Sequence, residues 1–167
     1  MIKTFNFLFV TMLGLGKVKF IPGTFGSFAT VIILYICFHV LHLNSNTILL
    51  GLLLIFGYSF IAISNHTKDS ENKDPGEIII DEFIGQSIPI YLYEISHGTA
   101  KQPSEAIIIY AVCFILFRYF DIKKPYPVSY FDKKHKNSFG VIMDDVCAGF
   151  YVVLTLICFM VLKSYIL

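Results

Sequence analysis

The stretch Thr47–Ser64, TILLGLLLIFGYSFIAIS, decides the fold class, because it runs for 18 residues without a charged side chain. A helix needs about 20 mainly apolar residues to cross the hydrocarbon core of a bilayer, and a helix satisfies its own backbone in lipid. Four further apolar segments flank this one: Phe25–Leu43, Ile78–Tyr93, Ala106–Phe120 and Val146–Leu162. The sequence therefore predicts an all-α, polytopic membrane helical bundle with about four to five membrane-embedded helices.

The composition agrees with a membrane location. Hydrophobic residues make up 56% of the chain and charged residues 15%, against about 45–50% and 25% in soluble proteins. A soluble domain of 167 residues keeps too much of its surface in water to hide this apolar area. We expect one integral membrane domain over residues 1–167. Residues 1–16 are expected to form a retained interfacial helix, because no small-x-small cleavage site follows their short apolar run.

Several function classes are disfavoured by the sequence. The net charge of +1 creates no global field for nucleic acid. The four cysteines show no C-x-x-C spacing, so a zinc or redox site has little support. Cys113 precedes Arg118 by five residues inside an apolar helix without glycines, which does not suit a cysteine phosphatase. A histidine-based lipid phosphatase needs His and Arg motifs, and the chain has a single Arg.

The basic residues alternate along the connections between the apolar segments. Ten of the 13 fall in three alternate connections: Lys17 and Lys19, Lys68 and Lys73, and six in the stretch 118–136. The positive-inside rule makes that side cytoplasmic. This topology requires Ile78–Tyr93 to cross the membrane or nearly so.

Acidic residues stand at the mouth of Ile78–Tyr93. Asp81 and Glu82 follow three isoleucines, and Glu77 lies four residues before Asp81, which predicts a shared helical face. Charges inside apolar segments are costly and are functional candidates. The alternative is a solvated helix start favoured by the helix dipole. It explains Glu77 better than it explains Asp81 and Glu82.

Two more acidic sites lie on the same predicted side. Arg118 and Asp121 end the fourth segment, followed by Lys124 before a proline, and Asp144 and Asp145 precede the last apolar segment. Each has a structural alternative. Arg118 and Asp121 could form an ion pair at three-residue spacing, and Lys124 could be a lysine that extends its head to the membrane surface. Asp144 and Asp145 could be partners of the helix dipole at a helix start. Three acidic sites from three helices, with no His or Cys partner, favour a hard cation such as Mg²⁺. At the start of the first span, the Gly, Thr and Ser of Pro22–Ser27 favour either an anion site or a simple turn and cap.

Four motifs taken together resemble one family, the bacterial phosphatidylglycerophosphatase A family. They are Pro22–Ser27 (PGTFGS), Asp74–Gln86 (DPGEIIIDEFIGQ), Phe117–Pro127 (FRYFDIKKPYP) and Gly140–Gly149 (GVIMDDVCAG). Their order and spacing match from about residue 14 to residue 151. The resemblance implies Mg²⁺-dependent removal of the terminal phosphate of phosphatidylglycerophosphate, giving phosphatidylglycerol in phospholipid biosynthesis. It also implies the bacterial inner membrane, with the active site facing the cytoplasm. One departure is Asn137-Ser138, where the family usually has a Gly pair.

Neither the residues nor the resemblance assigns an individual role to each side chain, so we predict groups of residues for each role. The predicted catalytic carboxylates are Asp81, Glu82, Asp121, Asp144 and Asp145. The predicted metal ligands are Glu77, Asp81, Asp121, Asp144 and Asp145. The predicted phosphate-binding residues are Thr24, Ser27, Arg118 and Lys124. Attack by a water that the metal ion activates is the first hypothesis, and a carboxylate nucleophile forming an aspartyl-phosphate is the second.

Two alternatives from other classes stay open. Buried acids also mark ion pathways, so a small ion or proton carrier is possible by composition. It predicts acids at both sides of the membrane, whereas the sequence suggests acids clustered at one side. The other alternative is a non-catalytic lipid-binding subunit that uses the same basic surface.

Overall fold

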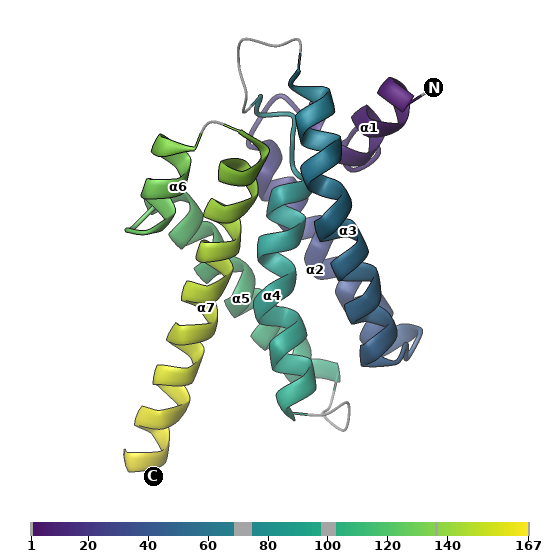
Figure 1. Ribbon diagram of the computed structural model, residues 1–167. Helices are drawn as coiled ribbons and strands as arrows, with labels where there is room; N and C mark the ends of the chain where they lie inside the picture. Colours follow the sequence, from purple (N-terminus) through teal and green to yellow (C-terminus); the bar gives the residue numbers. More distant parts are fainter. Residues whose placement is uncertain (1, 69–74, 98–102, 136, 167) are drawn as a thin grey trace.

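The chain folds into a bundle of helices, seen in a computed structural model that describes residues 2–68, 75–97, 103–135 and 137–166 (Figure 1). Every regular element in these ranges is helical. Asp74, Lys73, Lys101 and Lys136 lie outside the described residues. The elements in order are α1 (Ile2–Val10), η1 (Leu15–Lys17), α2 (Pro22–Tyr35), η2 (Ile36–Val40), α3 (Ser45–His66), α4 (Ile80–His97), α5 (Pro103–Lys123), α6 (Val128–Lys134) and α7 (Ser138–Ile166). The expectation of an all-helical fold is confirmed.

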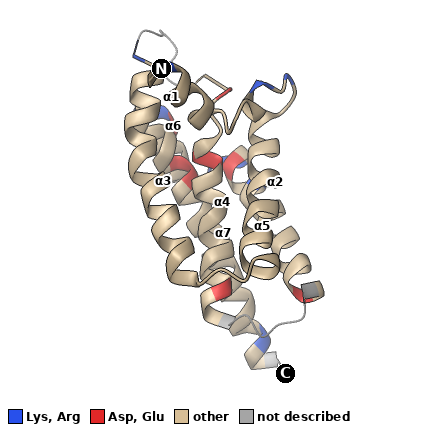
Figure 2. Ribbon diagram, turned by 90° about the vertical axis from the view of Figure 1, so that its right-hand side faces the viewer, with Lys and Arg blue, Asp and Glu red and all other residues tan. Residues whose placement is uncertain are grey.

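Helix α4 lies at the centre of the bundle and contacts α2, α3, α5 and α7. The long helices alternate in direction, so the connections that contain the described lysines lie at one end, near α1 and α6 (Figures 1 and 2). Helix α1 ends at Val10, well before the end of the expected stretch 1–16, and it packs on α3, where the Tyr58 hydroxyl donates a 2.6 Å hydrogen bond to Asn6 Oδ1. Its interfacial position stays a prediction. The helices thus alternate in direction as the predicted topology requires, and the assignment of one end to the cytoplasm stays a prediction.

Within the described ranges, three helical stretches are long and apolar enough to cross a membrane: Pro22–Val40, Ser45–His66 and Ser138–Tyr165. Large apolar side chains face outward from them, with Leu54 and Phe159 each 66% exposed. In lipid this exposure carries no hydrophobic penalty. Helices α4 and α5 are not among the three candidates, and α4 carries Asp81 and Glu82 in its first turn. The predicted four to five membrane-embedded helices are therefore not confirmed.

One expectation about helix starts is wrong, and one alternative explanation fails. Helix α4 begins at Ile80, so Glu77 precedes it and does not share a helical face with Asp81. The reason is a turn at Gly76 and Glu77, closed by a hydrogen bond from the Ile78 N–H to the Pro75 carbonyl, after which the Ile79 N–H donates to the Val10 carbonyl of α1 at 3.0 Å. Helix α7 begins at Ser138, with no acid in its first turn, so Asp144 and Asp145 lie inside the helix. A helix-start explanation therefore fails for this last pair and suits Asp81 and Glu82 instead.

Two glycines let α4 and α7 approach closely. A Cβ on Gly85 would lie 2.5 Å from the Asp145 carbonyl oxygen, and one on Gly149 would lie 2.4 Å from the Gly85 carbonyl oxygen. Both distances are too short for any side chain carbon, and the opposing atoms are backbone. This close crossing brings the Asp145 side of α7 against the first turns of α4.

Candidate metal and phosphate site

Three carboxylates converge where α4 meets α7. Asp81 and Glu82 of α4 and Asp145 of α7 each offer an oxygen, and these oxygens all lie within 4.8 Å of one another. Asp81 is 7% exposed and Asp145 3% exposed. Figure 2 shows acidic positions gathered inside the bundle, towards the end that carries the basic connections. Water therefore screens little of the repulsion between the carboxylates.

The same carboxylates have unsatisfied atoms. Asp81 Oδ1, Glu82 Oε2 and Asp145 Oδ1 are buried without a hydrogen-bond partner. Both polar atoms of the Gln86 side chain, about one turn further along α4, are also unpaired. Buried charge without a partner is strongly unfavourable unless it is neutralised or coordinates a metal. An all-oxygen set of this kind suits a hard cation such as Mg²⁺, so the residues fit the ion that the sequence predicted.

Asp121 and Arg118 stand beside this cluster. Arg118 Nη1 lies 2.8 Å from Asp121 Oδ2, and it also reaches the Ser27 hydroxyl at 3.4 Å. Asp121 is close enough to Glu82 and Asp145 to repel both electrostatically. Arg118 Nε is buried and has no partner. The Arg118–Asp121 pair is not a surface ion pair, because the two side chains are only 16% and 14% exposed. It places a cation with an unused N–H donor beside the carboxylates.

Lys124 occupies another edge of the site. Its Nζ lies 2.9 Å from Asp144 Oδ2 on α7 and 2.5 Å from Asp132 Oδ1 on α6. Burial works to lower the pKa of the Lys124 ammonium, but hydrogen bonds and opposite charges from Asp132 and Asp144 outweigh it and raise the pKa. Lys124 therefore stays charged. Asp144 contacts this lysine and lies near the metal-capable group without belonging to it.

The first turn of α2 closes the site from a third direction. A Cβ on Gly23 would lie 2.1 Å from Glu82 Oε1 and 3.2 Å from Arg118 Nη1, so only glycine leaves room for both groups. The Ser27 hydroxyl donates to the Gly23 carbonyl at 2.9 Å. Thr24 is half-buried in the same turn. The residue that caps α2 is Ile21, whose side chain makes no capping hydrogen bond, so the cap expected from Ser or Thr is absent there.

Glu77 lies apart from the three convergent carboxylates. Its Oε1 is 3.0 Å from His66 Nε2 at the end of α3, and its side chain is 36% exposed. The structure therefore does not bring Glu77 into the metal-capable group, because the turn before α4 directs it towards α3. Its role as a ligand stays a prediction.

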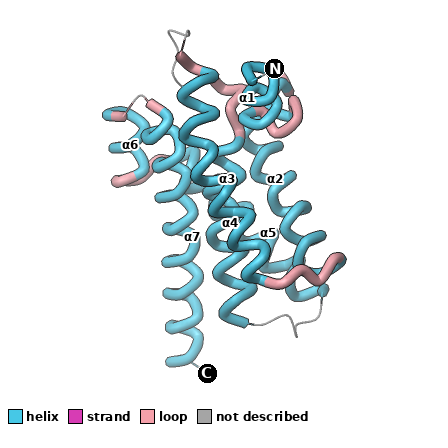
Figure 3. The backbone as a smooth tube through the Cα atoms, turned by 45° about the vertical axis from the view of Figure 1, so that its right-hand side comes forward, coloured by secondary structure: helices cyan, strands magenta, loops and turns pink. Residues whose placement is uncertain are grey.

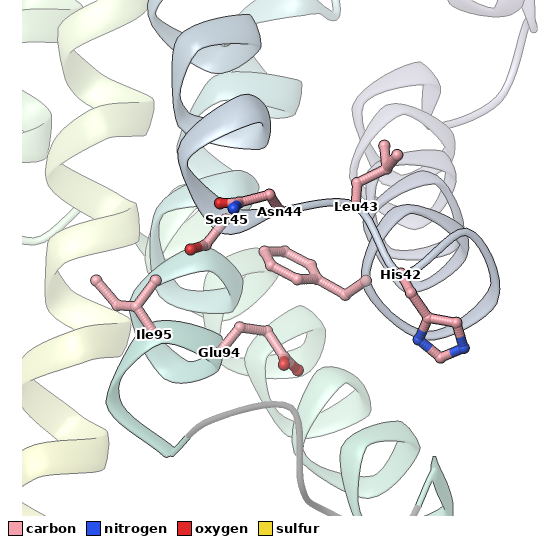
Figure 4. Close-up of a pocket in the computed structure, with 7 residues that line it drawn as sticks. His42, Leu43, Asn44, Ser45, Glu94 and Ile95 are labelled. Carbon is pink, nitrogen blue, oxygen red and sulfur yellow. The ribbon is translucent and has the colours of Figure 1, made fainter.

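Sequence reasoning missed a second buried polar cluster, near the other end of α4. Glu94 Oε1 accepts a hydrogen bond from the Tyr110 hydroxyl at 3.0 Å and lies 3.0 Å from His39 Nε2. A neighbouring cavity of about 400 Å³ is lined by residues that include Glu94, Asn44 and Ser45 (Figure 4). Buried acids therefore occur near both ends of α4, and the expectation of acids at one side only is wrong. The sequence did contain a signal for this cluster, because Glu94 is a charged residue directly after the apolar segment Ile78–Tyr93.

A comparison with protein families identifies the chain. The family model described as phosphatidylglycerophosphatase A matches residues 8–160. The chain belongs to the phosphatidylglycerophosphatase A family. The match covers all four sequence motifs, and the phosphatidylglycerophosphatase A family resemblance that they suggested is confirmed.

Curated relatives agree with this membership. A protein of Haemophilus influenzae named phosphatidylglycerophosphatase A is 36% identical over 141 residues, covering 84% of this chain and 80% of the relative. One of Escherichia coli K12 with the same name is 30% identical over 137 residues, covering 81% and 72%. A Bacteroides thetaiotaomicron protein, named provisionally as a phosphatidylinositol-3-phosphatase, is 32% identical over 146 residues, covering 84% of each chain. No solved structure matches the chain.

The motifs of the phosphatidylglycerophosphatase A family meet around one site in this structure. The first supplies Gly23 and Ser27, the second Asp81 and Glu82, the third the stretch from Arg118 to Lys124, and the fourth Asp144 and Asp145. Segments far apart in the sequence are thus joined by contacts between side chains. Asp132 also contacts the site but lies between the third and fourth motifs.

Proposed function

We propose that the protein hydrolyses phosphatidylglycerophosphate to phosphatidylglycerol and phosphate, with Mg²⁺ as cofactor, in phospholipid biosynthesis. The observation that carries this proposal is the group of three convergent carboxylates, Asp81 and Asp145 buried and Glu82 half-buried, each with an oxygen that lacks a hydrogen-bond partner, beside Arg118 and Lys124. Membership of the family supports the choice of substrate. The location would be the bacterial inner membrane, with the site on the cytoplasmic side, as the positive-inside rule indicates for the lysine-bearing end.

Each part of the site has a task in this reaction. Asp81, Glu82 and Asp145 would hold Mg²⁺, which when bound supplies positive charge to stabilise the phosphoryl oxygens. Arg118 and Lys124 would bind the phosphate. A guanidinium offers planar donors and an ammonium a point charge, and both suit phosphate oxygens. Arg118 Nε is buried without a partner and is therefore a donor still to be used.

The chemical step is a hydrolysis. The oxygen of a water molecule forms a bond to phosphorus, and the bond between phosphorus and the glycerol oxygen breaks. One proton of the water passes to a carboxylate of the site, and a protonated carboxylate of the site gives a proton to the glycerol oxygen as it leaves, so that no net proton is gained or lost by the protein. The second hypothesis, a carboxylate nucleophile, differs by forming an acyl phosphate that can be trapped.

The surroundings of the carboxylates suit a lipid. A cavity of about 380 Å³ lies between α3, α4 and α7, and its lining is almost wholly apolar. Ile84, one turn after Asp81, and Val146, next to Asp145, both line it. An acyl chain in this cavity would keep the lipid close to the carboxylates. The cavity supports a membrane lipid over a soluble phosphate ester.

One observation favours the ion-carrier alternative. Glu94 gives the bundle a buried acid near the other end of α4. The two readings are separable, because a carrier moves protons or cations across sealed vesicles without added lipid phosphate. Vesicles with the purified protein that show no such flux would remove the alternative.

The test of the proposal is phosphate release by the purified protein in mixed detergent micelles. The substrates are phosphatidylglycerophosphate, phosphatidate, phosphatidylinositol 3-phosphate and soluble glycerol 3-phosphate, each with Mg²⁺ or with EDTA. We expect Mg²⁺-dependent release, fastest from phosphatidylglycerophosphate. No release from any lipid phosphate would overturn the proposed activity. Faster phosphate release from another lipid would overturn the assignment of phosphatidylglycerophosphate as the substrate. Equal rates with Mg²⁺ and with EDTA would overturn the assignment of Mg²⁺ as the cofactor.

A further inference from the structure

Asp132, on the short helix α6, contacts the site although no sequence motif includes it. Its Oδ1 lies 2.5 Å from Lys124 Nζ, and the same Nζ lies 2.9 Å from Asp144 Oδ2. The lysine head is therefore held between two carboxylates from two different helices. We propose that Asp132 is a positioning residue, which holds the Lys124 ammonium where it binds the phosphate of the substrate. This inference rests on the proposed function.

The backbone of Lys124 is fixed in an unusual conformation. Its φ is 45°, in the left-handed region, and its N–H donates to the Phe120 carbonyl at 2.9 Å as α5 ends. The left-handed conformation is uncommon for residues other than glycine. It turns the chain out of α5 and towards α6. With the backbone fixed, Asp132 and Asp144 set where the head of the side chain lies.

The hydrogen-bonding capacity of lysine leaves one place for a ligand. An ammonium has three N–H donors. Asp132 and Asp144 accept two of them, so a third is available for a phosphate oxygen. Asp144 is close enough to Asp81 and Asp145 to interact with both electrostatically, so the ammonium is linked to the metal-capable group through one shared carboxylate. Two fixed bonds restrict the direction of the third.

A simple surface ion pair is the alternative reading of Asp132. Exposed pairs of this kind contribute little to stability. Here the Lys124 and Asp132 side chains are each only 30% exposed, and the pair is extended by Asp144, which is 9% exposed. Helix α6 is already anchored without the pair, because Val128 is fully buried and the Phe131 and Phe139 rings contact each other at 6.0 Å. The Asp132–Lys124 contact is therefore not needed to hold α6. Its proposed role is to position the Lys124 side chain.

The experiment measures kcat and KM for phosphatidylglycerophosphate with Mg²⁺ in Asp132→Asn, Asp132→Glu, Lys124→Gln and the double variant Asp132→Asn/Lys124→Gln. Glu105→Gln, an acid in the first turn of α5, is the matched control. We expect Asp132→Asn to raise KM about tenfold with a smaller change in kcat, since a charge-assisted hydrogen bond is lost. Asp132→Glu should regain part of the loss. In the double variant the Asp132 change should have no further effect, because it acts through Lys124.

The outcomes separate this inference from the proposed function. A wild-type protein without phosphatase activity overturns both. An active wild type with an unchanged KM in Asp132→Asn overturns the inference alone, as does an Asp132 effect of full size in the Lys124→Gln background. If the Asn variant does not fold, Asp132→Glu decides, because it keeps the charge and shifts the carboxylate by one methylene. A KM above the wild-type value, up to that of Lys124→Gln, in a folded Glu variant then supports the inference, whereas a wild-type KM in that variant contradicts it.

Discussion

Gly23 gives the sharpest test of how the site is packed. The substitution Gly23→Ala places a Cβ 2.1 Å from Glu82 Oε1 and 3.1 Å from Glu82 Cδ. An ordinary contact begins near 3.4 Å, so the carboxylate oxygen must retreat by roughly 1.3 Å. The atom that yields is the end of a flexible side chain, and alanine suits a helix better than glycine by about 1 kcal/mol. The fold should therefore tolerate the change.

Activity should not tolerate it. A misplacement of about 1 Å in a catalytic group can lower the rate about 100-fold, which corresponds to roughly 2.7 kcal/mol of transition-state stabilisation. We expect a loss of that order in kcat/KM for phosphate release, with an unchanged or slightly higher unfolding temperature. Gly57→Ala on α3, where a Cβ meets nothing within 4 Å, is the matched control. Wild-type kcat/KM in a folded Gly23→Ala protein would refute the packing of Glu82 against α2.

Three further predictions follow from particular contacts. Millimolar Mg²⁺ should raise the thermal unfolding temperature of the wild type by ligand binding, and Asp145→Asn should lose most of that shift; an equal shift in the variant would count against the metal site. Gly149→Ala should lower the free energy of unfolding by about 2 kcal/mol by overpacking, because the new Cβ lies 2.4 Å from the Gly85 carbonyl oxygen, a backbone atom. Thermal unfolding in detergent measures this change, and an unchanged midpoint would contradict the close crossing of α4 and α7. Tyr110→Phe should cost about 1–2 kcal/mol of stability, because Glu94 loses its hydroxyl donor, while kcat stays at the wild-type value; a lower kcat would connect the two polar clusters.

The helical bundle could be predicted from hydrophobic runs, because a run of apolar residues near spanning length has few other solutions. The number of embedded helices could not. Helix α4 is 18 residues long and carries both Asp81 and Glu82, and it is placed at the centre of the bundle by its contacts with four helices. Such a helix is buried by protein on several sides, and its own hydropathy does not report that burial.

The acids of the site could be predicted as candidates, but their grouping could not. The expected set joined Glu77 to Asp81 by helical spacing, and the turn before Ile80 breaks that spacing. Glu82 was expected to lie near the ligands, and it lies among the three convergent carboxylates. Asp132 was not found at all, since its partner Lys124 is eight residues away on another element. Pairing across elements depends on packing, which one sequence does not display.

Figure 3 shows why the site is confined to one region: the loops that adjoin α1 and α6 lie at the same end of the bundle. The motifs at the ends of α2, α4, α5 and α7 meet near that end because antiparallel helices return there. Among the described residues, the ion pair of Glu94, near the other end of α4, is made with His39 and not with a lysine or arginine. Glu94 is instead satisfied by Tyr110 and His39. The charges thus distinguish the two ends.

The most direct test of the central claim is phosphate release from phosphatidylglycerophosphate by acid-to-amide variants, at saturating Mg²⁺ and with the fold checked by thermal unfolding. The account predicts that Asp81→Asn, Glu82→Gln and Asp145→Asn each lose at least 100-fold in kcat/KM, whereas Glu105→Gln, remote from the site, keeps the wild-type value. Wild-type rates in the first three variants, or equal losses in all four, would contradict a catalytic site built on the convergent carboxylates.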